Sequence, residues 1–187
     1  MKLVKSALLA ASLMLLTFSP SWALEPEEVL KLTVEESGNY FYGWSVDVDG
    51  DTAVVGAPRQ WTENGRGAAY VYTRVGETWQ LEQRLISPDV AAGNDRFGYR
   101  VSVSGDRLLV SARFDDDLGD NSGSAYLFDR SAGSWSFQQK LNASDGVAGD
   151  QFGLSVRVSG DWAFVGSSRE SVYVFQLADG TWSEEEI

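Results

Sequence analysis

Side chains of the kind that bind metals are densest in one short stretch, which reads Asp115-Asp116-Asp117-Leu118-Gly119-Asp120-Asn121. Carboxylate and amide oxygens are the ligands that Ca²⁺ prefers, and it needs about six to eight of them. Asp115, Asp117 and Asp120 are therefore the candidates for a calcium site. The interpretation that we favour is a solvated acidic loop, because the two related segments described below carry no counterpart. We accordingly expect no cofactor unless this loop takes calcium.

The chain contains no histidine and no cysteine. Imidazole bases, thiol nucleophiles and the commonest zinc and copper ligands are thereby excluded, and a serine triad lacks its base. A carboxylate pair of the glycosidase type remains as an alternative, but it needs two acids across a cleft. The acids that recur, Asp51, Asp106 and Asp161, have the positions of turn formers. We therefore predict that the protein is not an enzyme.

Aromatic side chains could stack on a sugar ring or a protein surface. Those that recur at fixed spacing are expected to pack inside the fold, as core residues do: Phe97, Phe152, Trp79, Trp135 and Trp182. Trp61 has no equivalent elsewhere in the chain and lies in a connection of variable length. An unrepeated aromatic residue on a surface loop is the better candidate for contact with a partner. Trp61 is therefore our candidate contact residue.

A repeat of about 55 residues organises the chain. Gly43, Gly98 and Gly153 lie 55 residues apart, and each is followed by the same alternation of apolar and polar residues. Further on, each repeat has a tyrosine that stands nine residues before a tryptophan. Recurrence in register identifies a repeat architecture. The distance from the turn aspartate to the tyrosine varies, at 19, 20 and 12 residues, so this connection must be a surface loop.

Each repeat predicts four antiparallel strands. The first strand alternates, as in Val46-Asp47-Val48, which indicates one buried face and one wet face. Asp49-Gly50 and its counterparts then supply the residues of a two-residue hairpin. The second strand is continuously apolar, as in Leu108-Leu109-Val110, so Leu109 should be buried between neighbouring sheets.

The third and fourth strands follow the variable loop. The third is rich in residues that favour pleated surfaces, as in Ala125-Tyr126-Leu127-Phe128. In the fourth, Trp79, Leu81 and Leu85 alternate with polar residues. This last strand is the most polar, which is typical of an outer edge. Four strands that repeat in sequence, apolar inside and polar at the outer strand, indicate a β-propeller blade.

A family resemblance supports this fold. Tyr42-Gly43 and Val54-Val55-Gly56-Ala57-Pro58 resemble the "FG" and "GAP" ends of the FG-GAP repeat, which also occurs in the propeller of integrin α-subunits. The resemblance covers about Lys31 to the C-terminus, is closer to the bacterial branch of the family, and implies propeller-type blades. The calcium loop of integrin-type repeats is not carried over, because the hairpin at Asp49-Gly50-Asp51 is too short to supply the ligands.

Three blades are fewer than the ~4–8 that close a propeller. The fold class that we predict is therefore all-β, with three four-stranded antiparallel blades in a partial or open propeller. The chain could be a fragment of a longer array, blades from several chains could assemble, or the sheet could stay open. We favour the fragment, because repeat arrays need capped ends and none is evident. Otherwise the open blade faces should self-associate, because they would leave apolar area in water.

The first 23 residues have the layout of a secretory signal peptide. Two lysines precede an apolar run, Ala7 to Phe18, which is too short to span a bilayer, and Ser21-Trp22-Ala23 offers a cleavage site. We predict a secreted, periplasmic or cell-surface protein. The predicted organisation is a signal peptide at 1–23, an N-terminal segment at 24–40 with a closing strand, and blades at about 41–96, 97–151 and 152–187.

The net charge of −12 gives the chain no electrostatic reason to bind nucleic acid or an anionic membrane surface. No segment after the leader is apolar enough to insert into a membrane. We predict an exported, non-catalytic interaction module whose variable blade loops bind a protein or glycan partner. The alternatives are an extracellular hydrolase of the carboxylate type and a purely structural repeat segment of a larger surface protein.

Overall fold

The computed structural model describes residues 30–34, 39–60, 66–89 and 94–185. The described strands all lie in one compact unit, Leu32–Ile187. The predicted signal peptide lies outside the described residues. Within the described ranges every regular element is a β-strand, and no helix there could cross a membrane. The predicted all-β fold is confirmed.

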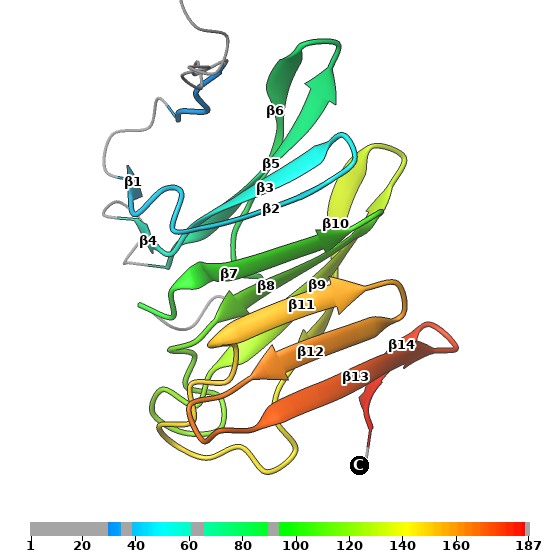
Figure 1. Ribbon diagram of the computed structural model, residues 1–187. Coiled ribbons are helices and arrows are strands. Elements are labelled where there is room, and N and C mark those ends of the chain that lie inside the picture. The colour runs from blue at the N-terminus through cyan, green and yellow to red at the C-terminus, as the bar shows by residue number, and fades with distance from the viewer. Residues whose placement is uncertain (1–29, 35–38, 61–65, 90–93, 186–187) are drawn as a thin grey trace, which may run out of the picture. The chain divides into compact units, whose positions relative to one another are not determined.

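Three four-stranded antiparallel sheets follow one another along the chain, one for each sequence repeat (Figure 1). We call them blades 1, 2 and 3. Blade 1 contains β2 (Ser45–Asp49), β3 (Thr52–Ala57), β5 (Ala68–Val75) and β6 (Thr78–Leu85). Blade 2 contains β7 (Phe97–Ser104), β8 (Arg107–Ala112), β9 (Ser124–Ser131) and β10 (Ser134–Leu141). Blade 3 contains β11 (Ser155–Ser159), β12 (Trp162–Gly166), β13 (Val172–Ala178) and β14 (Thr181–Glu184).

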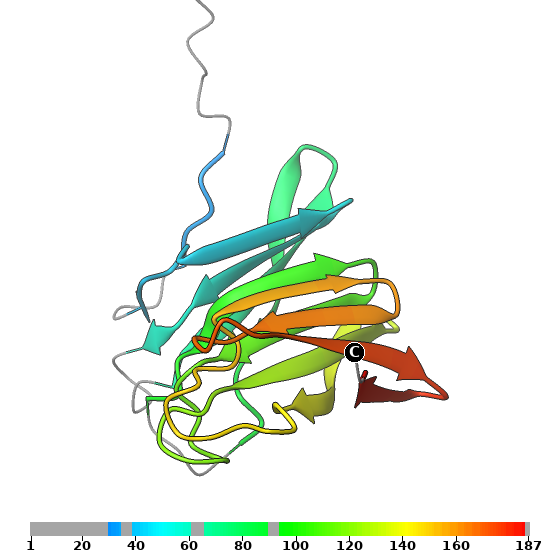
Figure 2. The same ribbon diagram turned by 60° about the horizontal axis from the view of Figure 1, so that its bottom comes forward.

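The strands of each blade lie side by side in chain order, and the first strands gather together. β7 contacts both β2 and β11, as both views show (Figures 1 and 2). The outer edges are β6, β10 and β14. A small separate sheet pairs β1 (Asn39–Tyr40) with β4 (Arg59–Gln60). No sheet closes on itself among the described strands, which agrees with a partial or open propeller.

The hairpin between the first two strands turns one residue later than predicted. Asp49 pairs with Thr52, so the two loop residues are Gly50 and Asp51, and the other two blades have the same register. Gly50 has a φ of 57°, which glycine adopts without strain. Asp51 then accepts a hydrogen bond from Nε of Arg74 in β5, at 2.7 Å. The aspartate belongs in the loop because it anchors the third strand there.

Burial of the first strand depends on which blade it belongs to. In blade 2, Val101 and Val103 are only 6% and 2% exposed, and Ser102 between them is buried as well, because β7 lies between two neighbours. In blade 1 the predicted burial of the valine face is wrong. Val46 and Val48 are 68% and 59% exposed, because no described strand packs against them. Leu109 in β8 is fully buried, as predicted.

The outer strands of blades 1 and 2 carry a β-bulge that the alternating pattern does not predict. The register of β6 shifts between Leu81 and Gln83, and that of β10 shifts between Phe137 and Gln139. The bulge places Leu81 and Leu85 on opposite faces of the blade: Leu81 is exposed, as is Phe137 in β10, whereas Leu85 beyond the bulge is buried. The single apolar face predicted for the outer strand is therefore wrong. A bulge inserts a residue and re-aims the side chains that follow it.

Two hydrophobic cores lie between the blades. Val54 and Val71 of blade 1 pack in one cluster with Val101 of blade 2. Leu109 of blade 2 packs in a second cluster with Val158 of blade 3. The repeated aromatic residues that the sequence assigned to packing are buried or half-buried in these clusters or beside blade 1: Phe97, Phe152, Trp79, Trp135 and Trp182.

Candidate functional site

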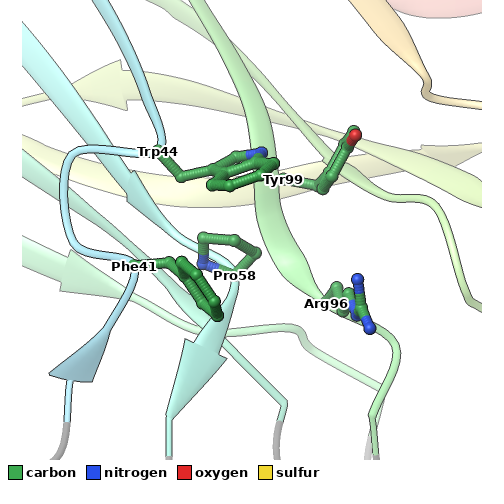
Figure 3. A pocket seen from close by; sticks show the side chains of 5 residues that line it. All are labelled: Phe41, Trp44, Pro58, Arg96 and Tyr99. Atoms are coloured by element: carbon green, nitrogen blue, oxygen red, sulfur yellow. The ribbon is translucent and has the colours of Figure 1, made fainter.

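A pocket of about 170 Å³ opens where the chain enters blades 1 and 2, and we call it the aromatic pocket (Figure 3). Its lining residues are Phe41, Trp44, Pro58, Arg96 and Tyr99. Phe41 and Trp44 are 50% and 47% exposed and pack edge to face, with ring centroids 5.4 Å apart. Trp44 also meets Tyr99, with centroids 5.8 Å apart. Large aromatic surfaces therefore stay open to a partner here.

The same tight turn positions the residues on both sides of the aromatic pocket. The backbone N–H of Trp44 donates to the carbonyl of Phe41 at 3.0 Å, and that of Tyr99 donates to the carbonyl of Arg96 at 3.1 Å. Phe41 and Arg96 have φ angles of 70° and 58°, which are uncommon for residues other than glycine. Repeat 3 forms the same turn with Gln151 and Leu154, so it brings no aromatic residue from this turn to the next junction.

Arginine side chains surround Tyr99. The guanidinium of Arg113 lies 4.2 Å from the centroid of the Tyr99 ring, and that of Arg100 lies 4.6 Å from it. Arg113 also donates to the Tyr99 hydroxyl at 3.1 Å. Arg96 lies 4.3 Å from the centroid of Phe114. Cation–π contacts of this kind hold the guanidinium groups in place, so a chain with a net charge of −12 carries a local cationic surface beside an apolar pocket.

These residues were missed by sequence reasoning, which singled out Trp61. Trp61 lies outside the described residues. Trp44 and Tyr99 occupy the same position in consecutive repeats, and neither belongs to a hydrophobic cluster between blades. The available signal is their position directly after the repeated glycine, where repeat 3 has Leu154 instead.

The three repeats match a known repeat family. A family model of the FG-GAP repeat matches residues 28–72, 79–128 and 135–175. The chain belongs to the FG-GAP repeat family. The second and third matches run from the outer strand of one blade to the third strand of the next, so the family's repeat crosses the blade boundary. A search of curated proteins finds no relative that matches the chain.

The two ends of the FG-GAP motif meet across the junction between blades 1 and 2. Gly98 has a φ of 86°, and a Cβ there would lie 2.1 Å from the carbonyl oxygen of Ala68. A Cβ on Gly56 would lie 2.2 Å from the carbonyl oxygen of Gly98. The "FG" of repeat 2 therefore packs backbone to backbone against the "GAP" of repeat 1. Pro58, the last residue of that motif, then forms one wall of the aromatic pocket.

Two of the three calcium candidates of this FG-GAP protein lie together. Carboxylate oxygens of Asp115 and Asp117 lie within 4.8 Å of one another and of Asp89. The Lys140 ammonium binds all three: Nζ lies 2.6 Å from Asp89 and 3.0 Å from Asp115, and it also bonds Asp117. We call these four residues the acidic cluster. Asp120 lies apart, and its carboxylate accepts a hydrogen bond from Asn121.

The electrostatics of the acidic cluster keep its lysine charged. Burial alone would lower the pKa of Lys140, but hydrogen bonds to Asp117, Asp89 and Asp115 outweigh it and raise that pKa above its usual value. Burial likewise acts to raise the pKa of Asp89, yet hydrogen bonds from Lys140 and Tyr126 lower it overall. The ammonium group thus stands where a bound cation would stand, and it compensates the carboxylates.

Part of the acidic cluster repeats and links neighbouring FG-GAP units. The Tyr126 hydroxyl lies 2.7 Å from a carboxylate oxygen of both Asp89 and Asp115. The Tyr173 hydroxyl donates to Asp145 in the same way, at 2.7 Å. In each case the loop after the outer strand of one blade is tied to the third strand of the next. This repetition gives the tyrosine–aspartate pair a structural role.

Asp95 is a buried acid beside the acidic cluster. It is 1% exposed, and neither carboxylate oxygen has a hydrogen-bond partner in the described part of the chain. Burial, followed by the charges of Asp115 and Asp116, raises its pKa to about 6. Such a carboxyl resembles the general acid of a glycosidase in its protonation. A side chain this deeply buried does not reach a substrate, so the geometry does not favour the hydrolase alternative.

Proposed function

We propose that this protein is a non-catalytic binding module whose partner docks at the aromatic pocket. The observation that carries the proposal is the pairing of Phe41 and Trp44, both about half exposed, around one hollow with Arg96 at its wall. Exposed aromatic rings that gather in one place mark interaction sites. The partner that fits is a protein that inserts an apolar side chain into the pocket and places a carboxylate against the arginines.

The size of the pocket supports a large partner. A pocket of about 170 Å³ is smaller than the ~300–1,000 Å³ that encloses a whole small ligand. It holds one ring or side chain of something larger. Tryptophan, tyrosine and arginine are the residues that dominate the binding energy of protein interfaces, and Trp44, Tyr99 and Arg96 meet here.

The distribution of charge favours a protein over an acidic polysaccharide. The whole chain has a net charge of −12, which repels a long polyanion. Beside the pocket, positive charge gathers on the arginines around Tyr99, where Arg113 and Arg100 stack on the ring. A protein that presents one or two carboxylates beside an apolar side chain matches that local arrangement without meeting the rest of the acidic surface.

Export is the second part of the proposal. The leader at residues 1–23, with Ala23 before the cleavage site, would place the FG-GAP blades in the periplasm, at the cell surface or in the medium. The binding module then acts outside the cytoplasm. Mass spectrometry of the protein purified from a host that exports it should find a chain that begins at Leu24; a chain found intact in the cytoplasm would contradict export.

The binding test uses a random peptide library displayed on phage, because the pocket defines the partner only by its chemistry. The wild-type chain should enrich peptides in which a large apolar residue adjoins Asp or Glu. Trp44→Ala should lose that enrichment, and the control Val75→Ala, which truncates an exposed residue outside the pocket, should keep it. Trp44-dependent binding to a glycan array instead would identify a glycan partner. If neither assay shows binding that depends on Trp44, the result would contradict the binding proposal and favour the alternative of a purely structural repeat segment.

A further inference from the structure

The two junctions between blades use the same pair of positions. In blade 1, Val54 pairs with Val71 across β3 and β5, and both side chains are fully buried against blade 2. In blade 2, Leu109 pairs with Leu127 in the same register and is buried against blade 3. We call these paired positions the trailing face of a blade. The face that receives them is the leading face, which begins with Val101 in blade 2.

Blade 3 has a trailing face that no described residue covers. Phe164 pairs with Val174 across β12 and β13, in the register of the two covered pairs. Phe164 is 39% exposed and the neighbouring Trp162 is 40% exposed. A hollow of about 490 Å³ lies over Ser159, Trp162, Phe164 and Val174. The paired position that is buried at both internal junctions is therefore apolar and exposed in blade 3.

Blade 1 has the matching leading face, and it is open as well. Val46 and Val48 are the counterparts of Val101 and Val103, which are buried in blade 2. Both blade 1 valines are mostly exposed. Among the described residues, nothing covers the trailing face of blade 3 or the valines in the inner part of the leading face of blade 1. Each of these surfaces is built like the half of a junction that exists elsewhere in the same molecule.

A hydrogen bond between hairpins accompanies the apolar contact at each junction. The open faces of blades 1 and 3 carry the donor and the acceptor of the same bond. Asp49 accepts a hydrogen bond from the backbone N–H of Gly105 at 2.7 Å. Ser104 accepts one from the backbone N–H of Gly160 at 3.4 Å. Blade 3 presents the exposed Ser159 in this position, and blade 1 presents the hairpin glycine that would donate.

The outer half of the leading face of blade 1 is already filled. Leu85 ends the outer strand of blade 1 and packs into the core against blade 2, and Leu141 does so against blade 3. Leu32 packs against the corresponding core residues of blade 1. The part of a junction that is left open at blade 1 is therefore the inner part, at Val46 and Val48, which is the part that a trailing face covers.

We propose that a second copy of this chain fills both faces, with the trailing face of blade 3 against the leading face of blade 1 of the other copy. Contacts of this head-to-tail kind form rings when the rotation closes and filaments when it does not. A ring needs ~4–8 blades. Each copy brings three, so one copy is too few, two give six, and three exceed the range. Two copies therefore close one six-bladed ring about a two-fold axis.

The test is the mass in solution of the purified chain by light scattering over a dilution series. We expect twice the mass of one chain. Val46→Asp and Phe164→Asp, each placing a charge in one face, should each halve that mass, whereas Val75→Asp, at an exposed position in the β5–β6 hairpin, should not. Trp44→Ala should leave the mass unchanged, which separates this proposal from the binding function. A single-chain mass at every concentration, or an open-ended polymer, would overturn the proposal.

The direction of the contact is tested by cross-linking, because the chain has no cysteine of its own. Val46→Cys and Phe164→Cys are purified separately and oxidised alone or after mixing. A disulfide-linked dimer should form in the mixture and not in either sample alone. Cross-linking of Phe164→Cys with itself would show a tail-to-tail contact and overturn the head-to-tail arrangement, whether or not the mass is that of two chains.

Discussion

Gln83 holds the backbone of Trp135 with both ends of its side-chain amide. Its Oε1 accepts the Trp135 N–H at 2.8 Å, and its Nε2 donates to the Trp135 carbonyl at 2.8 Å. Gln139 repeats the arrangement with Trp182, at 2.9 and 2.7 Å. The bulges in β6 and β10 position these glutamines. An outer strand otherwise presents unpaired backbone groups, so the amide ties each outer edge to the next blade.

We predict that Gln83→Ala lowers the free energy of unfolding by about 1–3 kcal/mol, because two backbone groups of Trp135 lose their partner. Urea unfolding followed by tryptophan fluorescence measures the change. Gln80→Ala, an exposed glutamine in the same strand, is the matched control and should change stability by less than about 0.5 kcal/mol. Equal effects of the two substitutions would show that the amide contact adds nothing to stability.

Gly98 is the residue of the "FG" motif that tolerates least change. Its φ is 86° and a Cβ would lie 2.1 Å from the Ala68 carbonyl oxygen, so Gly98→Ala combines backbone strain with a clash against backbone. Gly105 has a φ of 56° and open space, so Gly105→Ala brings strain alone, about 1–2 kcal/mol. We expect Gly98→Ala to cost at least ~2 kcal/mol more, up to loss of folding, in the same unfolding assay. Equal losses of stability in Gly98→Ala and Gly105→Ala would contradict the close backbone contact between blades 1 and 2 at Gly98.

The sequence predicts the strands well because their signals are local and recur. The alternation, the turn glycines and the apolar second strand each report on one blade, and Leu109 is buried as expected. Burial between blades is not local, which is why the burial of Val46 was predicted wrongly: its pattern matches Val101, but only Val101 has a neighbouring blade. The bulge between Leu81 and Leu85 is also not predictable, because nothing in the alternation of apolar and polar residues marks the inserted residue.

The candidate site was predictable only in part, for the same reason. Asp115 and Asp117 stand out in one loop, but Asp89 and Lys140 join them from other strands and loops. The aromatic pocket depends on two turns from consecutive repeats. The left-handed backbone at Phe41 has no sequence signal, because residues other than glycine seldom adopt it.

The buried acid Asp95 makes the stability depend on pH. Its pKa is raised to about 6, so folding favours its neutral form. Below about pH 3 it is protonated in both states and contributes nothing. As the pH rises to about 6, the unfolded state gains by ionising first, so the folded state loses stability, and the loss stays constant above that pH. We predict that Asp95→Asn is more stable than the wild type above pH 6, by up to ~3 kcal/mol, and equal to it near pH 3.

Urea unfolding at pH 3 and pH 7 measures this difference, and the comparison of two chains cancels the titration of the other carboxylates. Asp120→Asn, which changes an exposed acid outside the acidic cluster, should shift stability little at either pH. A pH-independent gap between Asp95→Asn and the wild type would mean that Asp95 is not held in its neutral form by the fold.

The ammonium group of Lys140 compensates the negative charges of three neighbouring carboxylates. Replacing it in Lys140→Met keeps the apolar stem and leaves Asp89, Asp115 and Asp117 without their cation. We expect a loss of about 3–5 kcal/mol in the free energy of unfolding, the usual cost of removing one partner from a buried ion pair. Arg74→Met is the control: it breaks an ion pair with Asp51 whose side chains are both well exposed, and it should cost no more than about 1 kcal/mol.

Added Ca²⁺ should affect the stability of the wild type and of Lys140→Met differently. In the wild type the ammonium group holds the carboxylates, so we expect added Ca²⁺ to change the melting temperature little. In Lys140→Met the carboxylates are released, and Ca²⁺ should restore part of the lost stability, by about 2.7 kcal/mol at 100 times its dissociation constant. A large calcium-dependent rise in the wild type, abolished by Asp115→Ala or Asp117→Ala, would show that the ion displaces Lys140 and that the loop is a calcium site in its own right. If the melting temperature of Lys140→Met does not respond to Ca²⁺, the released carboxylates do not supply the several oxygen ligands that a calcium site needs.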